Sequence, residues 1–95
     1  MELRKEIKKS FPRIEKLFSE DKLLEFFWTL PDHLEKYQFG LGTMIRLKLL
    51  RPKSMLYRTF IQNGFTDKDE MTMAVIREFY YNIRSRGYKL NSKSE

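Results

Sequence analysis

The sequence predicts an all-α fold, a compact bundle of five to six short helices with a longer C-terminal helix. Three observations predict it. Apolar residues recur at spacings of three and four, most strictly from Met71 to Ile83, and this spacing is typical of amphipathic helices. No segment alternates apolar and polar residues as a half-buried strand would. Pro and Gly residues separate the apolar segments at short intervals.

The length of 95 residues predicts one domain. We expect residues 1–90 to form this single helical domain and residues 91–95 to be a disordered polar tail. The eight Phe, five Tyr and one Trp can bury large areas in the core. The residues that we expect at its centre are Phe27, Leu41, Ile45, Leu49, Phe60, Val75 and Phe79.

The N-terminal stripe of apolar residues is interrupted by Pro12. Proline removes a backbone donor and clashes with the preceding turn, so we expect Phe11 to leave the α region. This predicts a short basic helix over residues 2–9 and a second one that begins near Pro12, with Ser10 as a possible cap. One kinked helix through Pro12 is the alternative.

The densest apolar cluster, residues 23–30, predicts a helix that ends near Thr29, before Pro31. The acidic residues around its start, Glu20, Asp21 and Glu25, suit a first helical turn because the helix dipole favours negative charge there. Pro31 then begins another short helix, which closes at Phe39-Gly40.

Residues 41–50 are apolar on several faces, which predicts a helix at the centre of the domain. After a break at 51–54, Ser54 is the predicted N-cap of a helix over residues 55–62. Asn63-Gly64 ends this helix with a left-handed residue. The buried side of the helix is predicted to consist of Met55, Leu56, Phe60 and Ile61.

The C-terminal helix is predicted from its two ends. Thr66 and Asp69 have the spacing of a capping box, with Asp in place of the usual Glu. A long helix follows to about Ser85, and Gly87 is the expected stop. Its core stripe is Met71, Val75, Phe79 and Ile83, widened on one side by Met73, Ile76 and Tyr80.

Composition excludes several function classes. The sequence has no Cys, so disulfides and thiolate metal sites are excluded. Residues 1–10 are charged and lack the apolar core of a secretory signal, and no apolar stretch approaches the ~20 residues of a membrane span. We therefore expect a cytoplasmic protein without membrane association. The net charge of +6 is uneven along the chain, which could steer a charged partner.

No residue pattern points to catalysis, a metal or a cofactor. The single histidine, His33, has Asp32 and Glu35 nearby, but neither shares its helical face. The acids near Asp67 lack the glycine and distal glutamate of a calcium loop. The serines lack the surroundings of an activated nucleophile. Gly40-Leu41-Gly42 lacks the third glycine of a phosphate-binding loop and favours a tight turn between helices. We predict a protein that is not an enzyme.

Two aromatic triplets predict a surface for another protein. Residues 26–28 and 79–81 cannot all point inward from one helix, because adjacent residues lie ~100° apart around its axis. Trp28 and Tyr81 are the members that we expect near the surface. Exposed aromatic residues beside Arg are typical interface anchors. The candidate partner-binding residues are Trp28, Tyr57, Tyr81 and Arg84.

The alternative function is nucleic-acid binding through the basic segment 46–58, which contains no acidic residue. Its candidate residues are Arg46, Lys48, Arg51, Lys53 and Arg58. A helix-turn-helix around Asn63-Gly64 is less favoured, since the first turn of its second helix would bring acidic side chains to DNA. We therefore prefer a non-enzymatic protein-interaction or accessory module with a protein partner.

Two motifs carry a resemblance to a known family. Gly40-Leu41-Gly42 is followed by Ile45-Arg46, and Gly64 is followed by Asp69 and Met71-Thr72. This pattern resembles an uncharacterised small bacterial domain family, in which a His-Phe-Gly-Leu-Gly element precedes a Trp-Ile-Arg helix and a Pro-Asp-Asp-Met-Ser turn. The resemblance covers residues 28–84 and implies a bacterial helical domain without a known activity. The chain departs from the pattern at Gln38, Met44 and Lys68.

Overall fold

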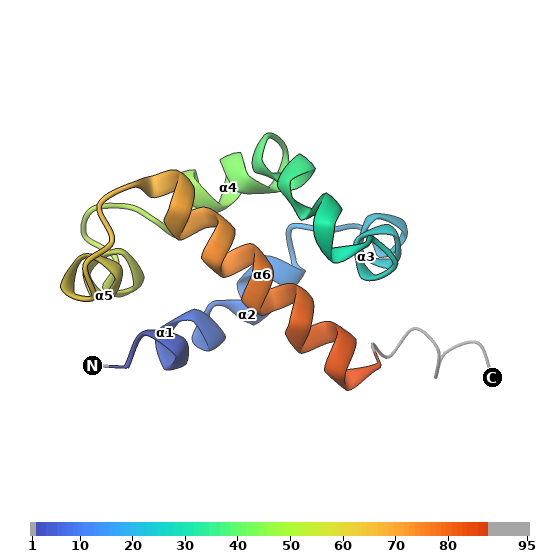
Figure 1. The fold of residues 1–95 in the computed structure, drawn as a ribbon, viewed down its shortest axis with the longest axis horizontal. Coiled ribbons are helices and arrows are strands. Elements are labelled where there is room, and N and C mark those ends of the chain that lie inside the picture. Colours follow the sequence, from blue (N-terminus) through green and yellow to red (C-terminus); the bar gives the residue numbers. More distant parts are fainter. Residues whose placement is uncertain (1, 88–95) are drawn as a thin grey trace.

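The computed structural model describes residues 2–87 and confirms the all-α class (Figure 1). No strand occurs among the described residues. Within residues 2–87, six α-helices and one 3-10 helix, η1, follow one another. They are α1 (Leu3–Lys9), α2 (Phe11–Glu15), α3 (Glu20–Phe27), η1 (Pro31–Gln38), α4 (Leu41–Lys48), α5 (Met55–Gln62) and α6 (Lys68–Arg86). The expected tail at 91–95 lies outside the described residues.

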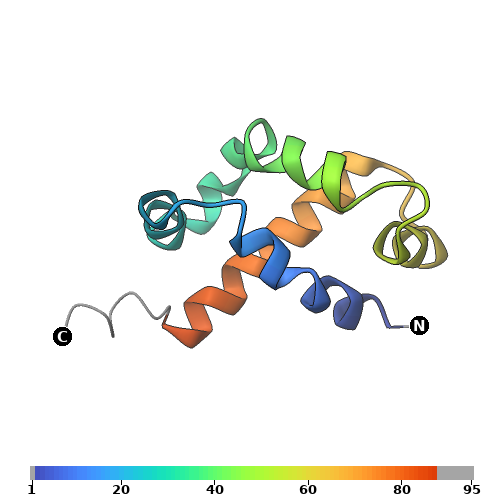
Figure 2. The ribbon, with the colours of Figure 1, turned by 180° about the vertical axis from the view of Figure 1, so that it is seen from behind.

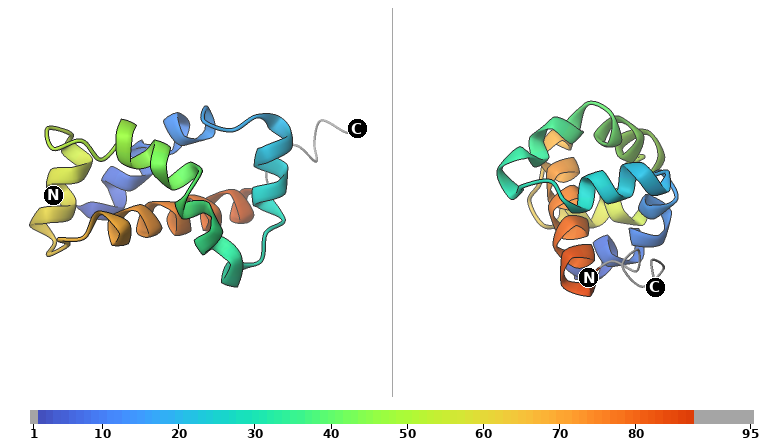
Figure 3. Two further views of the ribbon diagram at one scale, coloured as in Figure 1. Left: turned by 90° about the horizontal axis from the view of Figure 1, so that it is seen from above. Right: turned by 90° about the vertical axis from the view of Figure 1, so that its right-hand side faces the viewer.

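The longest helix, α6, holds the other elements together. It crosses the molecule diagonally, inclined to the long axis (Figure 1 and Figure 3), and packs against α1, α3, η1 and α4. Its predicted stripe is confirmed, because Met71, Val75, Phe79 and Ile83 are fully buried. Helices α1 and α5 pack together at one end of the molecule, while α3 lies at the other end (Figure 1).

An aromatic cluster surrounds Phe79 inside the bundle. The ring of Phe79 lies 5.5 Å from that of Phe11, 6.0 Å from that of Phe18 and 5.7 Å from that of Phe26, measured between centroids. Phe26 also meets Tyr80 edge to face at 5.7 Å. These rings come from α2, the connection between α2 and α3, α3 and α6, so the cluster joins the N-terminal part of the chain to α6.

Several helix ends match the sequence prediction. The hydroxyl of Ser54 accepts a hydrogen bond from the Tyr57 amide at 3.0 Å and caps α5, whose bounds are those predicted. Gly64 has φ +91° and Gly87 has φ +71°, so both helices end at a left-handed glycine as expected. The helix begun by Pro31 is confirmed and is of the 3-10 type.

The predictions about the starts of two helices, α2 and α6, are wrong. Phe11 does not leave the helix: it is the first residue of α2, and the break between α1 and α2 consists of Ser10 alone. Ser10 does not cap α2, since its hydroxyl donates to the carbonyl of Ile7 at 2.5 Å. The N-cap of α6 is Asp67, one residue after the predicted Thr66, and its carboxylate accepts from the Asp69 amide at 2.9 Å.

Helices α4 and α5 are less central than predicted. Ile45 and Leu49 are buried, but Leu41 is only partly buried, and Met44 and Leu47 are exposed. On α5 the buried residues are Leu56, Thr59 and Phe60, whereas the predicted Met55 and Ile61 are exposed. Both helices therefore bury one face and leave part of their apolar surface exposed. On α3, Glu25 lies beyond the first turn, which holds Glu20 and Asp21.

Candidate functional site

Trp28 stands at the end of α3 with 63% of its surface exposed, although both neighbours in the chain, Phe27 and Thr29, are buried. The last carbonyls of a helix have no partner within the helix and need one elsewhere. Here α6 supplies the partners. Arg84 donates from Nη1 to the carbonyl of Phe27 at 2.7 Å, and the Tyr80 hydroxyl donates to the carbonyl of Thr29 at 2.5 Å.

Thr29 extends this attachment to η1. Its hydroxyl donates to the carbonyl of Glu25 at 2.9 Å and lies 3.0 Å from the hydroxyl of Tyr37. Residues 27 and 29 are thus fixed to α6 by hydrogen bonds, and residue 29 also to η1. The backbone of Trp28 is therefore held on both sides while its indole ring faces solvent.

Arg84 completes the site because its guanidinium lies over three aromatic rings. Its Cζ atom is 5.2 Å from the ring centroid of Phe27, 5.9 Å from that of Trp28 and 5.6 Å from that of Tyr80. Such cation–π contacts stabilise a guanidinium in a fixed position. Among residues 2–87, its hydrogen-bond acceptor is the Phe27 carbonyl, and the Arg84 side chain is exposed.

Tyr81 lies next to this stack. Its ring centroid is 5.3 Å from that of Tyr80, and the side chain is 54% exposed. The expectation that Trp28 and Tyr81 are the surface members of their triplets is confirmed. We name Trp28, Tyr81 and Arg84 the aromatic–arginine surface. It brings Trp28 together with two residues of α6 that lie more than fifty positions away in the sequence.

The fourth candidate, Tyr57, does not join this surface. It belongs to α5, at the opposite end of the molecule from α3 (Figure 1), and is half-buried. The Lys68 ammonium lies 5.5 Å from the centroid of its ring. Tyr57 therefore helps to pack α5 against the start of α6, at a distance from the other three candidates.

The basic segment 46–58 divides into one structural arginine and four exposed cations. Arg46 donates to the Gln38 side chain at 2.9 Å and to the Gln38 carbonyl at 3.1 Å, and it pairs with the Asp69 carboxylate at 3.6 Å. These contacts tie α4 to η1 and α6. The four exposed cations form no side-chain hydrogen bond or ion pair within residues 2–87; they are Lys48, Arg51, Lys53 and Arg58.

Gly42 explains part of the glycine motif. A Cβ atom there would lie 3.1 Å from Cγ2 of Thr72 and 3.2 Å from the carbonyl oxygen of Tyr37. The glycine thus allows α4 to approach α6 and η1 closely. The motif serves packing at the start of α4, in agreement with the predicted tight turn between helices.

Sequence reasoning missed the residues that fix the site. Tyr80 was assigned only to the core stripe, and Thr29 only to a helix end. Their hydrogen bond joins positions 51 residues apart, and no local spacing reveals such a contact. The Arg84–Phe27 bond spans 57 residues and is equally hidden. Within residues 2–87 no three His, Cys, Asp or Glu side chains are grouped to hold a metal ion.

The fold and this surface define a small helical domain with an exposed, preorganised aromatic–arginine surface. A sequence model described as a domain of unknown function (DUF6794) matches residues 5–83, and the chain belongs to this family. This agrees with the resemblance to an uncharacterised domain family. No curated protein and no solved structure is significantly similar to the chain. In the described part, no helix is both long and apolar enough to cross a membrane.

Proposed function

We propose that this domain is a non-enzymatic protein-interaction module, and that a partner protein binds its aromatic–arginine surface. One observation carries the proposal: Trp28 is 63% exposed although the carbonyls on both sides of it are bonded to α6. A large apolar ring held rigidly in water loses little conformational entropy when a partner covers it. Trp, Tyr and Arg are also the residue types that dominate binding energy at interfaces.

The chemistry of the surface specifies what the partner presents. Trp28 and Tyr81 offer ring faces that an apolar side chain can cover. The outer N–H groups of Arg84 match a carboxylate, which a guanidinium can bind through two parallel hydrogen bonds. The proposed partner therefore places an apolar residue and an Asp or Glu side by side on this surface.

The test begins with identification of the partner. The purified domain is cross-linked in extracts of its host that have been treated with nuclease, and the captured protein is then purified. Trp28→Ala should weaken its binding about thirtyfold, the equivalent of ~2 kcal/mol for a central anchor. Phe39→Ala is the matched control, because Phe39 is an exposed aromatic ring that follows η1 and is not one of the three residues of this surface.

Two outcomes would contradict the proposal. One is a partner whose affinity is unchanged by both Trp28→Ala and Tyr81→Ala in variants that melt like the parent. The other is capture that depends on intact nucleic acid and disappears on nuclease treatment. The second outcome, together with loss of binding in Arg51→Glu/Lys53→Glu, would favour nucleic-acid binding by segment 46–58.

A further inference from the structure

A groove runs between α4 and the chain that leads from α2 into α3. Figure 2 shows α4 above this part of the chain. The groove consists of two hollows of about 420 and 280 Å³ that share Leu17. Met44 lines the first hollow and Lys48 lines the second, one helical turn further along α4. The two hollows therefore follow the same face of α4.

The floor of the groove is apolar and its rim is cationic. The apolar side chains in the two linings are Leu17, Phe18, Tyr37, Leu41, Met44 and Leu49. The charged side chains are Arg13, Lys16, Lys22 and Lys48, and no carboxylate lines either hollow. We name this feature the cationic groove. Its charge is complementary to an acidic ligand.

The cations of the rim are only weakly engaged by the chain itself. Arg13 donates to the carbonyl of Lys48 at 3.4 Å, and Lys22 lies 3.8 Å from the Glu25 carboxylate in a pair that is mostly exposed. Long, exposed pairs of this kind contribute little to stability. A ligand carboxylate can therefore replace these two contacts with little loss of folding stability.

The first hollow is open where Gly40 lines its wall. A Cβ atom on Gly40 would have no atom within 4 Å, and Met44 is 39% exposed. Gly40 has φ −89° and ψ −77°, at the edge of the right-handed helical region, so its φ is negative like that of other residues. A larger side chain at position 40 would therefore start without a clash at a residue that lines the first hollow, which provides a way to alter that hollow.

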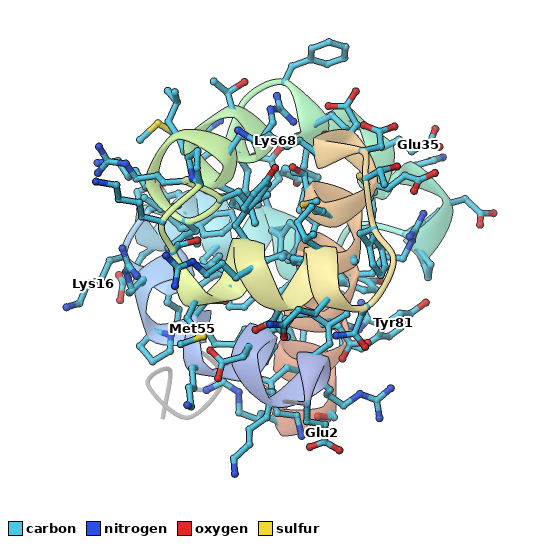
Figure 4. The ribbon with its side chains drawn as sticks, turned by 90° about the vertical axis from the view of Figure 1, so that its left-hand side faces the viewer. Glu2, Lys16, Glu35, Met55, Lys68 and Tyr81 are labelled. Carbon is cyan, nitrogen blue, oxygen red and sulfur yellow. The ribbon has the colours of Figure 1, made fainter. Side chains whose placement is uncertain are left out.

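We propose that the cationic groove binds an acidic amphipathic segment of a partner protein, with its apolar face on the floor and its carboxylates at the rim. Segments of this kind bind as amphipathic helices laid into apolar grooves. A nucleic acid is less suited, because phosphates need the cations but gain nothing from the apolar floor. The site is independent of the aromatic–arginine surface: Figure 4 shows Lys16 and Tyr81 on opposite sides of the molecule.

The probe is a fluorescent amphipathic peptide of about 18 residues, with Leu at helical spacing and Glu elsewhere. Binding to the full chain is measured by fluorescence anisotropy at about 0.15 M salt. The peptide should bind, and its counterpart with Lys in place of Glu should not. Lys48→Glu and Gly40→Leu should each weaken binding by about tenfold or more. Trp28→Ala should leave binding unchanged, which separates this site from the proposed function.

Lys53→Glu is the control for net charge. It changes the total charge by the same amount as Lys48→Glu, but Lys53 does not line the groove. Its effect should stay below about twofold. The proposal is overturned if the acidic peptide does not bind, if both peptides bind equally, or if Lys53→Glu and Lys48→Glu weaken binding equally. It is also overturned if a 20-base-pair DNA duplex displaces the peptide and Gly40→Leu leaves binding intact.

Discussion

Two adjacent tyrosines show how strongly one step along a helix changes the role of a residue. Tyr80 is 2% exposed, and its hydroxyl donates to the carbonyl of Thr29. Tyr81 is turned about 100° around the axis of α6 and lies at the surface. A buried carbonyl that loses its donor costs more than the bond itself contributes, because no water replaces the donor. The two hydroxyl groups therefore differ in their effect on stability.

We expect Tyr80→Phe to lower the free energy of unfolding by about 1–3 kcal/mol, since it leaves the Thr29 carbonyl unsatisfied. Tyr81→Phe is the matched control and should change it by less than about 0.5 kcal/mol. Urea unfolding of both variants measures the difference. Equal losses in the two variants would show that the Tyr80–Thr29 bond does not hold the end of α3.

At the scale of helices, the start of α6 shows a case in which the capping-box spacing predicts a different N-cap residue from the one in the structure. Thr66 and Asp67 are both favoured N-cap residues, and the spacing to Asp69 favours Thr66. The structure places the cap at Asp67, whose carboxylate bonds the Asp69 amide. Two adjacent residues that are both favoured as N-caps are thus not distinguished by the spacing rule alone.

Asp67→Ala should therefore lower the free energy of unfolding by about 1 kcal/mol through loss of the cap. Thr66→Ala is the control, because Thr66 is exposed and makes no side-chain hydrogen bond within residues 2–87; its effect should stay below about 0.5 kcal/mol. Thermal melting followed by circular dichroism measures both. A larger loss for Thr66→Ala would restore the predicted capping box.

The sequence could predict the parts of the fold that depend on local spacing, but not those that depend on packing between distant elements. The helix over residues 55–62, the left-handed Gly64 and the buried stripe of α6 depend on local spacing and are confirmed. The inward faces of α4 and α5 were only partly predicted. Spacing shows which residues share a face, but whether another element covers that face depends on the whole bundle. Likewise, the exposure of Trp28 followed from helix geometry, while its anchors on α6 required long-range contacts.

At the scale of the whole molecule, α6 passes through the core and contacts α1, α3, η1 and α4. Val75 is fully buried at its middle. A domain of this size has a total stability of only about 5–15 kcal/mol, and an unpaired buried charge costs several kcal/mol. Disturbing this one helix therefore affects four other elements at once.

Val75→Asp should abolish cooperative unfolding, with loss of the helical circular dichroism signal or a strongly lowered melting temperature. Arg77→Asp introduces the same side chain on the exposed side of α6, and its cost should remain below about 1 kcal/mol. A Val75→Asp variant that melts like the parent would show that the stripe from Met71 to Ile83 does not form the core.

The central position of α6 also determines the order in which the chain can fold during its synthesis. Phe11, Phe18 and Phe26 emerge from the ribosome long before Phe79, the ring around which they gather. At about 5–20 residues per second, the 19 residues of α6 alone take on the order of 1–4 s to add. Until α6 has been added, the rings of Phe11, Phe18 and Phe26 lack Phe79, the ring against which they pack. Folding of the domain is therefore completed only after synthesis of its last helix.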